Sequence, residues 1–322
     1  MKHPLLACAA ACAVWNMAWA PAAAAYPERP IRIVIGFPPG GAIDTIGRLI
    51  GPRLAERLGQ SVVIENKPGA GGIVALQGIG KAEPDGYTVL MGTMGNLSIS
   101  PGLVKDFSFD MEKDFAPVTV VASSVMVVYT HPSLPVRSVP ELIAYAKANP
   151  DKVNFASSGN GGLPHMAGEL FNSATGLKLV HVPYSGSAPA VKDVVAGQVQ
   201  MTIEAPAIGL PFVQSGQLRA LATTGRERSP VLPDVPTVAE SVPGYEVTNW
   251  FGIVAPARTP ADRIERLQKE IAVVLKEPEI RKRLDALGVA VVGSTPAQAG
   301  RYMAEERARW TKVIKDANIT TN

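Results

Sequence analysis

Three glycine-rich turns carry the residues of this chain that could contact a small anion. Their sequences are FPPGG at 37–41, KPGAGG at 67–72 and SSGNGG at 157–162. Each turn follows a stretch whose residue pattern predicts a strand and precedes one that predicts a helix. Backbone N–H groups at a helix start lack partners within the helix and, together with the helix dipole, favour an anion. The turns therefore predict an anion site built from neutral donors.

The turns differ in how strongly they indicate a ligand. In the third turn the hydroxyls of Ser157 and Ser158 precede flexible glycines, and such donors can hold a carboxylate without a cation. We interpret this turn as a binding site. For 67–72 we prefer a turn whose glycines need positive φ, with ligand contact as the alternative. The arginines that stay open as additional contacts are Arg32, Arg48 and Arg219.

Three further side chains next to these patterns each have two interpretations. His165 opens the helix after the third turn and fits a structural role better than a catalytic one. Tyr184, in the polar turn YSGS, fits a pocket wall and the core equally well. Glu204 ends the strand pattern VQMTIE and could meet a ligand amine, but a solvated carboxylate is the preferred interpretation.

The residue patterns of known catalytic and metal sites are absent from the sequence. After position 25 it holds His131, His165 and His181 and no cysteine, and it has no HExxH, paired Cys-x-x-Cys or GxSxG motif. The sequence GAGGIV at 69–74 begins like a dinucleotide fingerprint but has valine where the third glycine belongs. We therefore predict no metal site, no cofactor and no enzymatic activity.

The elements that position these turns alternate between strand and helix, which predicts an α/β fold with mainly parallel sheets. The predicted strands are 31–37, 61–66, 87–92, 118–130, 153–157, 178–183, 199–204, 218–223, 250–255 and 289–292. Capping boxes at Ser138–Glu141 and Thr295–Gln298 mark two helix starts. In open parallel sheets, ligands bind beyond the carboxyl ends of the strands, which is where the three turns lie.

Two stretches suggest that the chain forms two lobes. Residues 116–131 are long for one strand and could cross between lobes, and the proline-rich stretch 226–244 suits a return crossing. This layout predicts a discontinuous first lobe, 26–124 plus 226–322, and an inserted second lobe, 125–225. The cleft between two such lobes is the usual place for a ligand.

Residues 1–25 have the pattern of a secretory signal peptide. Leu5–Trp19 is an apolar run too short for a membrane anchor, and Ala23–Ala25 is a small-residue cleavage pattern. Both cysteines lie in this segment, so we expect an exported protein without disulfides. The net charge of +3, from 31 basic and 28 acidic residues, provides no electrostatic footprint for nucleic acid.

The order of several motifs resembles the substrate-binding proteins of tripartite tricarboxylate transporters, called the Bug family. The motifs include YPERPIRIVIGFPPGG, VVIENKPGAGG, PDGYTVL, SSGNGG, VPYSG and LPDVPTVAES, and the likeness spans about 26–318. The resemblance implies a periplasmic two-lobed binding protein of the type II, Venus-flytrap kind. Such a protein captures a small carboxylate, here a di- or tricarboxylate, an acidic amino acid or an aromatic acid, and delivers it to membrane permease subunits. We expect a monomer that binds no nucleic acid and does not insert stably into the membrane.

The resemblance also implies ligand-binding residues on both lobes. The first-lobe set is Phe37, Pro38, Gly40, Gly41, Asp44, Thr93 and Asn96. The second-lobe set, to which we add the acid that ends the VQMTIE strand, is Ser157, Ser158, Gly159, Gly161, His165, Tyr184, Ser185 and Glu204. Asp44 can organise its turn by capping instead of touching a negative ligand, because like charges repel. Where the family commonly has Asp-Asn, this chain has Glu204-Ala205, and Gln200 replaces an acid, so the identity of the ligand stays open.

Two other functions use the same residues differently. A periplasmic sensing subunit that docks on a receptor kinase would share the fold and the pocket, and the sequence does not separate it from a transport subunit. A secreted hydrolase would need a nucleophile–base pair among Ser157, Ser158 and His165, and we expect no turnover from them.

Overall fold

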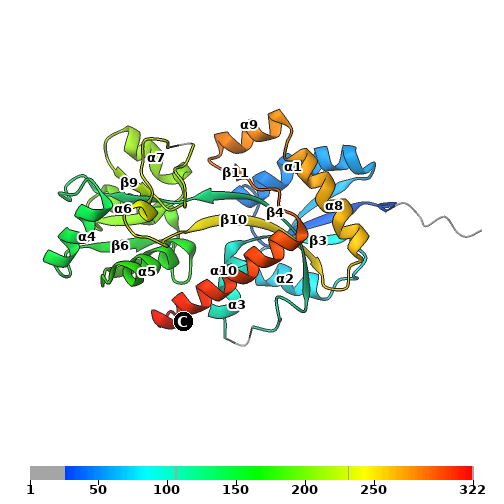
Figure 1. Cartoon of the computed structure of the whole chain (residues 1–322), viewed down its shortest axis with the longest axis horizontal. Coiled ribbons are helices and arrows are strands. Elements are labelled where there is room, and N and C mark those ends of the chain that lie inside the picture. The colour runs from blue at the N-terminus through cyan, green and yellow to red at the C-terminus, as the bar shows by residue number, and fades with distance from the viewer. Residues whose placement is uncertain (1–25, 106, 231, 321–322) are drawn as a thin grey trace, which may run out of the picture.

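The computed structural model describes residues 26–105, 107–230 and 232–320, which form two α/β lobes joined by strands (Figure 1). The signal-peptide prediction, 1–25, lies outside the described residues. The strand order is β11-β4-β10-β3-β1-β2 in the first sheet and β7-β6-β8-β5-β9 in the second. Within the described ranges, no helix has the length and hydropathy needed to span a bilayer.

The first lobe is a six-stranded sheet with helices on both faces. Its strands are β1 (Ile31–Ile35), β2 (Val62–Asn66), β3 (Thr88–Thr93), β4 (Phe115–Val125), β10 (Thr248–Pro256) and β11 (Ala290–Val291). Its helices are α1 (Ala42–Leu58), α2 (Ile73–Gly80), α3 (Ser100–Leu103), α8 (Ala261–Val274), α9 (Pro278–Ala286) and α10 (Pro296–Asp316), with short helical turns η1 (Ala70–Gly72) and η2 (Gly95–Ile99). Thr295 and Gln298 form both bonds of the predicted capping box at the start of α10.

The second lobe is built on a five-stranded sheet. Its strands are β5 (Val127–Thr130), β6 (Asn154–Ser157), β7 (Val180–Pro183), β8 (Met201–Glu204) and β9 (Arg219–Thr223). Its helices are α4 (Val139–Ala148), α5 (Leu163–Thr175), α6 (Ser187–Val195) and α7 (Pro206–Gln214); η3 (Val238–Glu240) follows on the return path. The Ser138 side chain accepts the Glu141 N–H and so caps α4, but the predicted capping box is incomplete because the Glu141 carboxylate accepts the Arg137 N–H instead of that of Ser138.

The two-lobed α/β fold is confirmed, but the sheets are mixed and not mainly parallel. β4 and β11 run antiparallel to their neighbours in the first sheet, and β10 is antiparallel to both β3 and β4. β5 is antiparallel to β8 and β9. The directions follow from the crossings between the lobes, because β4 ends and β5 and β10 begin at the edge where the two lobes meet. β5 therefore starts where β8 ends and must run the opposite way.

The crossings are tied together by a buried hydrogen-bond network around Thr224. The predicted strand 118–130 is divided at Met126 into β4 and β5. The Thr224 hydroxyl accepts the Met126 N–H at 2.8 Å and donates to the Val247 carbonyl at 2.6 Å. The backbone of Thr224 also bonds to Met126 and to Val247, at 2.9 Å each. The outgoing and returning segments are thus held side by side.

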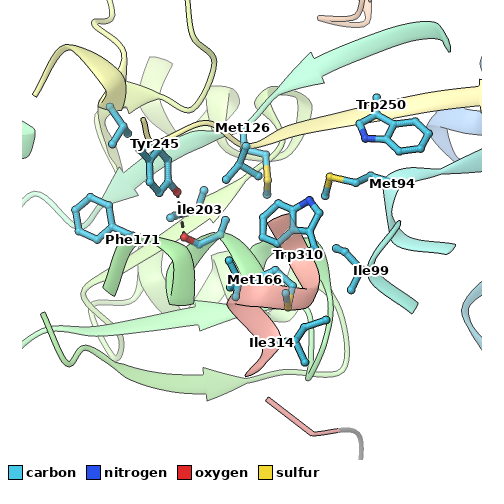
Figure 2. Close-up of a cluster of buried hydrophobic side chains, with 14 of the residues drawn as sticks. Met94, Ile99, Met126, Met166, Phe171, Ile203, Tyr245, Trp250, Trp310 and Ile314 are labelled. Atoms are coloured by element: carbon cyan, nitrogen blue, oxygen red, sulfur yellow. Dashed lines mark hydrogen bonds between the residues drawn. The ribbon is translucent and has the colours of Figure 1, made fainter. Parts of the chain in front are cut away.

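The two lobes share one hydrophobic cluster below these crossings. Figure 2 shows Met94 from the first lobe and Met126 and Met166 from the second gathered near Trp310 of α10. Tyr245, on the return path, donates its hydroxyl to the Ala167 carbonyl of α5 at 3.0 Å. Because the segment before Val247 packs on the second lobe, we propose that the chain returns to the first lobe near Val247 and not at the expected residue 226.

Candidate functional site

The predicted turns lie at sheet edges that meet at the crossings. Thr93 ends β3 beside the start of β10, whose Thr248 pairs with Val125, the last residue of β4. In the second sheet, Glu204 ends β8 and pairs with Val127, the first residue of β5. Because Val125 and Val127 are separated by one residue, the carboxyl ends of the parallel strands in both lobes point toward the junction between the lobes.

The first turn is held open by a network centred on Asp44. This side chain is 3% exposed and accepts the Gly40 N–H at 2.9 Å, Nε of Arg48 at 3.0 Å and Nδ2 of Asn66 at 2.9 Å. Asn66 also donates to the Phe37 carbonyl at 3.1 Å. The Arg48 hydrogen bond, followed by those of Gly40 and Asn66, lowers the pKa of Asp44 to about 2. Asp44 is therefore ionised and organises its own turn, as expected, although it does so through the Gly40 N–H before the helix and caps no N–H of α1.

The loop after β3 packs against the second glycine turn. The amide of Asn96 is fully buried, and its Oδ1 accepts the Thr93 N–H at 2.8 Å while Nδ2 has no partner. A Cβ placed on Gly72 would lie 2.7 Å from that Nδ2. Gly72 has φ of +93°, and Gly69 and Gly71 also have positive φ, which confirms the preferred interpretation of 67–72 as a turn with positive φ. The glycines let this backbone approach the Asn96 amide.

The third turn is built around the buried Ser157 hydroxyl. Oγ accepts the Gly159 N–H at 3.1 Å and lies 2.5 Å from Nε2 of His181, the second residue of the adjacent strand β7. The turn also contacts the next loop, since the Tyr184 N–H donates to the Ser157 carbonyl at 3.0 Å. Gly159 and Gly161 have φ of +125° and +72°, conformations that other residues rarely adopt.

Two histidine rings stack beneath this turn. The ring centroids of His165 and His181 are 3.8 Å apart and their planes differ by 8°, and Phe155 continues the stack at 5.0 Å from His181. His165 accepts the Gly161 N–H on Nδ1 at 3.0 Å. Burial lowers the pKa of both rings, that of His181 to about 4 with the nearby His165 contributing. His181 was missed as a site residue; the parallel pairing of the strands that carry Phe155 and His181 is the signal that brings it under the turn.

The remaining second-lobe candidates surround this turn in different ways. The Tyr184 hydroxyl donates to Asp193 at 2.7 Å, and burial and this carboxylate raise the pKa of Tyr184 to about 12. Ser185 is exposed. Both Ser158 and Gly161 are half-buried within the turn.

The interpretation of Glu204 as a solvated carboxylate is wrong. Its side chain is 3% exposed because β8 lies between β5 and β6 in the sheet, with α5 and α6 packed against it. Oε2 accepts the Ala205 N–H at 3.3 Å, and Oε1 is buried without a hydrogen-bond partner. Burial raises the pKa of Glu204, and the Ser187 side chain and the Ala205 N–H offset part of this effect.

The arginines considered as additional contacts are all engaged elsewhere. Arg48 belongs to the Asp44 network, Arg32 lies 3.6 Å from Glu65, and Arg219 donates to the Leu134 and Val136 carbonyls. The turns therefore offer mainly N–H and hydroxyl groups, which suit an anion held by dipoles. In the described part of the chain, no cluster of three or more His, Cys, Asp or Glu residues could hold a metal ion.

The candidates gather into one set per lobe. Among residues 26–105, 107–230 and 232–320, no hydrogen bond connects the turns of one set to those of the other. Two cavities, of about 450 and 870 Å³, lie along β4 and β10 and share Ser123 and Thr248. Neither of these two cavities is lined by a predicted site residue.

Comparison with known proteins gives one consistent picture. Residues 46–319 match the family model described as the tripartite tricarboxylate transporter family receptor. The chain is 36% identical over 293 residues to protein BugT of Bordetella pertussis, with 90% of each chain covered. It is similar to an R. palustris protein solved with adipate (37% identity, TM-score 0.76, 92% of this chain and 99% of that chain). It is also similar to MatC from Rhodopseudomonas palustris with bound malate (31% identity, TM-score 0.73, 90% and 100% covered).

Proposed function

Because the chain belongs to the tripartite tricarboxylate transporter receptor family, we propose that it captures a small carboxylate between its two lobes and delivers it to membrane permease subunits. The expected Bug-family resemblance is confirmed, and the family consists of receptors and not of enzymes, as the missing catalytic motifs predicted. Residues 1–25 would direct export to the periplasm, where such a receptor meets its solute.

The observation that carries the proposal is the pair of turn sets at the inter-lobe edges. Each set presents backbone N–H groups or hydroxyls ahead of a helix, α1 in the first lobe and α5 in the second. At neither helix start does the N-cap residue accept a backbone N–H with its side chain, so the first-turn N–H groups are available to an anion, except at Pro164 of α5, which has none. Two such ends suit a ligand with a carboxylate at each end.

The class of ligand is proposed from the two helix starts and from the relatives. One similar structure holds adipate and another holds malate, and both ligands are dicarboxylates that carry no cationic group. We propose a dicarboxylate of similar size for this chain. Closure of the lobes would bury the ligand between the two helix starts.

The test is binding of adipate, malate, succinate and citrate, with the uncharged diamide of each dicarboxylate and the triamide of citrate as control ligands. At a hundred times its dissociation constant, a true ligand adds about 2.7 kcal/mol to the free energy of unfolding, which a thermal-shift assay detects. The proposal fails if no carboxylate raises the melting temperature while neutral sugars or cations do. Expression of the full reading frame also tests export: the periplasmic product should begin at Tyr26 by mass spectrometry.

A matched pair of variants tests whether the third turn contacts the ligand. Gly161 precedes α5 with φ of +72°, and Gly176 follows the same helix with φ of +69°. Alanine is strained at both positions by a similar amount, about 1 kcal/mol. We expect Gly161→Ala to weaken carboxylate binding at least tenfold and Gly176→Ala to leave it unchanged. Equal effects of the two variants would remove the third turn from the site.

A further inference from the structure

The resemblance places His165 among the ligand-binding residues, but in the structure its ring bonds to the turn that would receive the carboxylate, and His181, stacked on it, has no assigned role. The Gly161 N–H can only donate, so its acceptor, Nδ1 of His165, must carry a lone pair. The His165 ring is therefore neutral in this structure, with its proton on Nε2. That nitrogen lies 3.8 Å from the Glu169 carboxyl, one helical turn along α5.

Protonation of His165 would place a second hydrogen on Nδ1, facing the Gly161 N–H. Two donors would then meet at 3.0 Å, and the bond that holds the turn would become repulsive. His181 responds differently, because its Nε2 faces the Ser157 hydroxyl, which can either donate or accept. Of the two stacked rings, only His165 has a protonated form that is incompatible with the observed turn.

The charged groups around the pair divide into those that favour and those that oppose this protonation. Glu169, on the same helix, favours it, although burial raises the pKa of that carboxyl. Lys178, before β7, and Asp316, at the end of α10, line a cavity together with Glu169. His181, whose ring centroid lies 3.8 Å from that of His165, opposes this protonation only once His181 is itself protonated, and Glu204 ends β8, on the other side of β6 from β7. Burial of both rings adds to the opposition.

We propose that His165 is a positioning residue for ligand capture: its neutral ring holds the turn at 157–162 through Gly161, so acidification loosens the turn and weakens binding of the carboxylate. Only the predicted effect on ligand binding rests on the proposed function. The coupling between the ring and the turn belongs to the free protein.

The coupling can be measured without a ligand by NMR of the protein labelled with ¹⁵N-glycine and ¹⁵N-histidine. The His165 ring nitrogens are titrated from pH 7.5 downward until they reach a midpoint, and the Gly161 amide should shift with the same midpoint. Titration of the ring with a stationary Gly161 amide would overturn the proposal, whatever ligand the protein binds.

The consequence for binding is measured as the dissociation constant of adipate or malate at pH 7.5 and at a pH below the His165 midpoint found by NMR. His165→Asn puts an amide oxygen near the place of Nδ1 and cannot titrate, whereas His165→Leu removes the acceptor. His131→Asn is the matched control, since His131 lies at the far end of β5 and bonds to Ser133. The ratio of the wild-type constant to that of His165→Asn cancels the titration of the ligand itself.

We expect that ratio to rise about three- to tenfold on acidification, the range that one hydrogen bond supplies. His165→Leu should bind three- to tenfold more weakly than wild type at both pH values, and His131→Asn should follow the wild type. A ratio that stays constant, or one that falls because a charged His165 attracts the carboxylate, would overturn the proposal. Failure of both ligands to bind any variant would instead count against the proposed function, with the NMR result deciding the coupling separately.

Discussion

Replacing Asp44 with asparagine separates an acid that organises its turn from one that touches the ligand. The buried carboxylate accepts N–H groups from Gly40, Arg48 and Asn66, and an amide of the same size would present a donor to one of them. We therefore expect Asp44→Asn to lower the free energy of unfolding and to weaken ligand binding only through the disturbed turn.

The magnitude follows from the pKa of Asp44, which is lowered from 3.8 to about 2. A difference of nearly two pKa units corresponds to about 2.5 kcal/mol. Arg48, the main cause, is half-exposed, so solvent screens the pair and we expect about 1 to 1.5 kcal/mol. Because the pKa is lower in the folded state, this stability is present above pH 3.8 and is lost as the pH falls toward 2. At pH 3 about half should remain.

The assay is urea unfolding followed by tryptophan fluorescence, since Trp250 and Trp310 are fully buried. Wild type, Asp44→Asn and Glu279→Gln are compared at pH 7 and pH 3, where the last variant breaks an exposed ion pair with Arg283 and should change stability by less than 0.5 kcal/mol. The reasoning is refuted if Asp44→Asn unfolds like wild type at pH 7 but no longer binds a carboxylate. Asp44 would then act on the ligand and not on the turn.

Three other predictions follow from the same network of turns and crossings. Burial lowers the pKa of His181 from 6.5 to about 4 in the folded state, so between these pH values the unfolded state binds more protons. The urea midpoint should therefore fall as the pH drops from 6.5 to 4. His181→Asn should lose part of this pH dependence, and an equal pH dependence in both proteins would refute the role of His181. Gly72→Ala would bring a Cβ to 2.7 Å from the Asn96 amide at positive φ and should lower the free energy of unfolding by roughly 2 kcal/mol, seen in calorimetry as a lower melting temperature. Gly78→Ala, in open space within α2, should raise the melting temperature slightly, and similar shifts for the two variants would contradict the packing argument. Thr224→Val leaves the crossing N–H and carbonyl groups without the hydroxyl and should reduce stability by about 1 to 3 kcal/mol in urea unfolding, and a loss below 0.5 kcal/mol would mean that the crossings are held by packing alone.

Local pattern predicted the elements well. Each predicted strand range overlaps a strand of the structure, and the range 118–130 contains both β4 and β5. This accuracy has a local cause, because alternation of apolar residues and glycine turns depends on a few neighbouring positions. Strand direction was predicted less well. The antiparallel pairing of β10 with β4 depends on where the chain crosses between lobes, and residues far apart in the sequence decide that.

The site shows the same division. The glycine turns and the acid Asp44 were found from their own sequence, and the family resemblance added Thr93 and Asn96, but the ligand contacts of all these residues stay a prediction. Glu204 was misjudged because a strand-end carboxylate has no local mark of burial. Only its position between β5 and β6 removes it from solvent.

The sequence by itself determined the family, the α/β class and the turns where backbone donors are proposed to face an anion. These features can be read from the sequence because turns, caps and strand periodicity depend on residues that are close together in the chain. The tertiary structure alone decided which side chains meet beneath those donors. Ser157 and His181 are 24 positions apart, and only the parallel pairing of β6 with β7 brings their polar atoms to 2.5 Å. Contacts of that kind depend on the register between strands, and register is set by the packing of whole sheets.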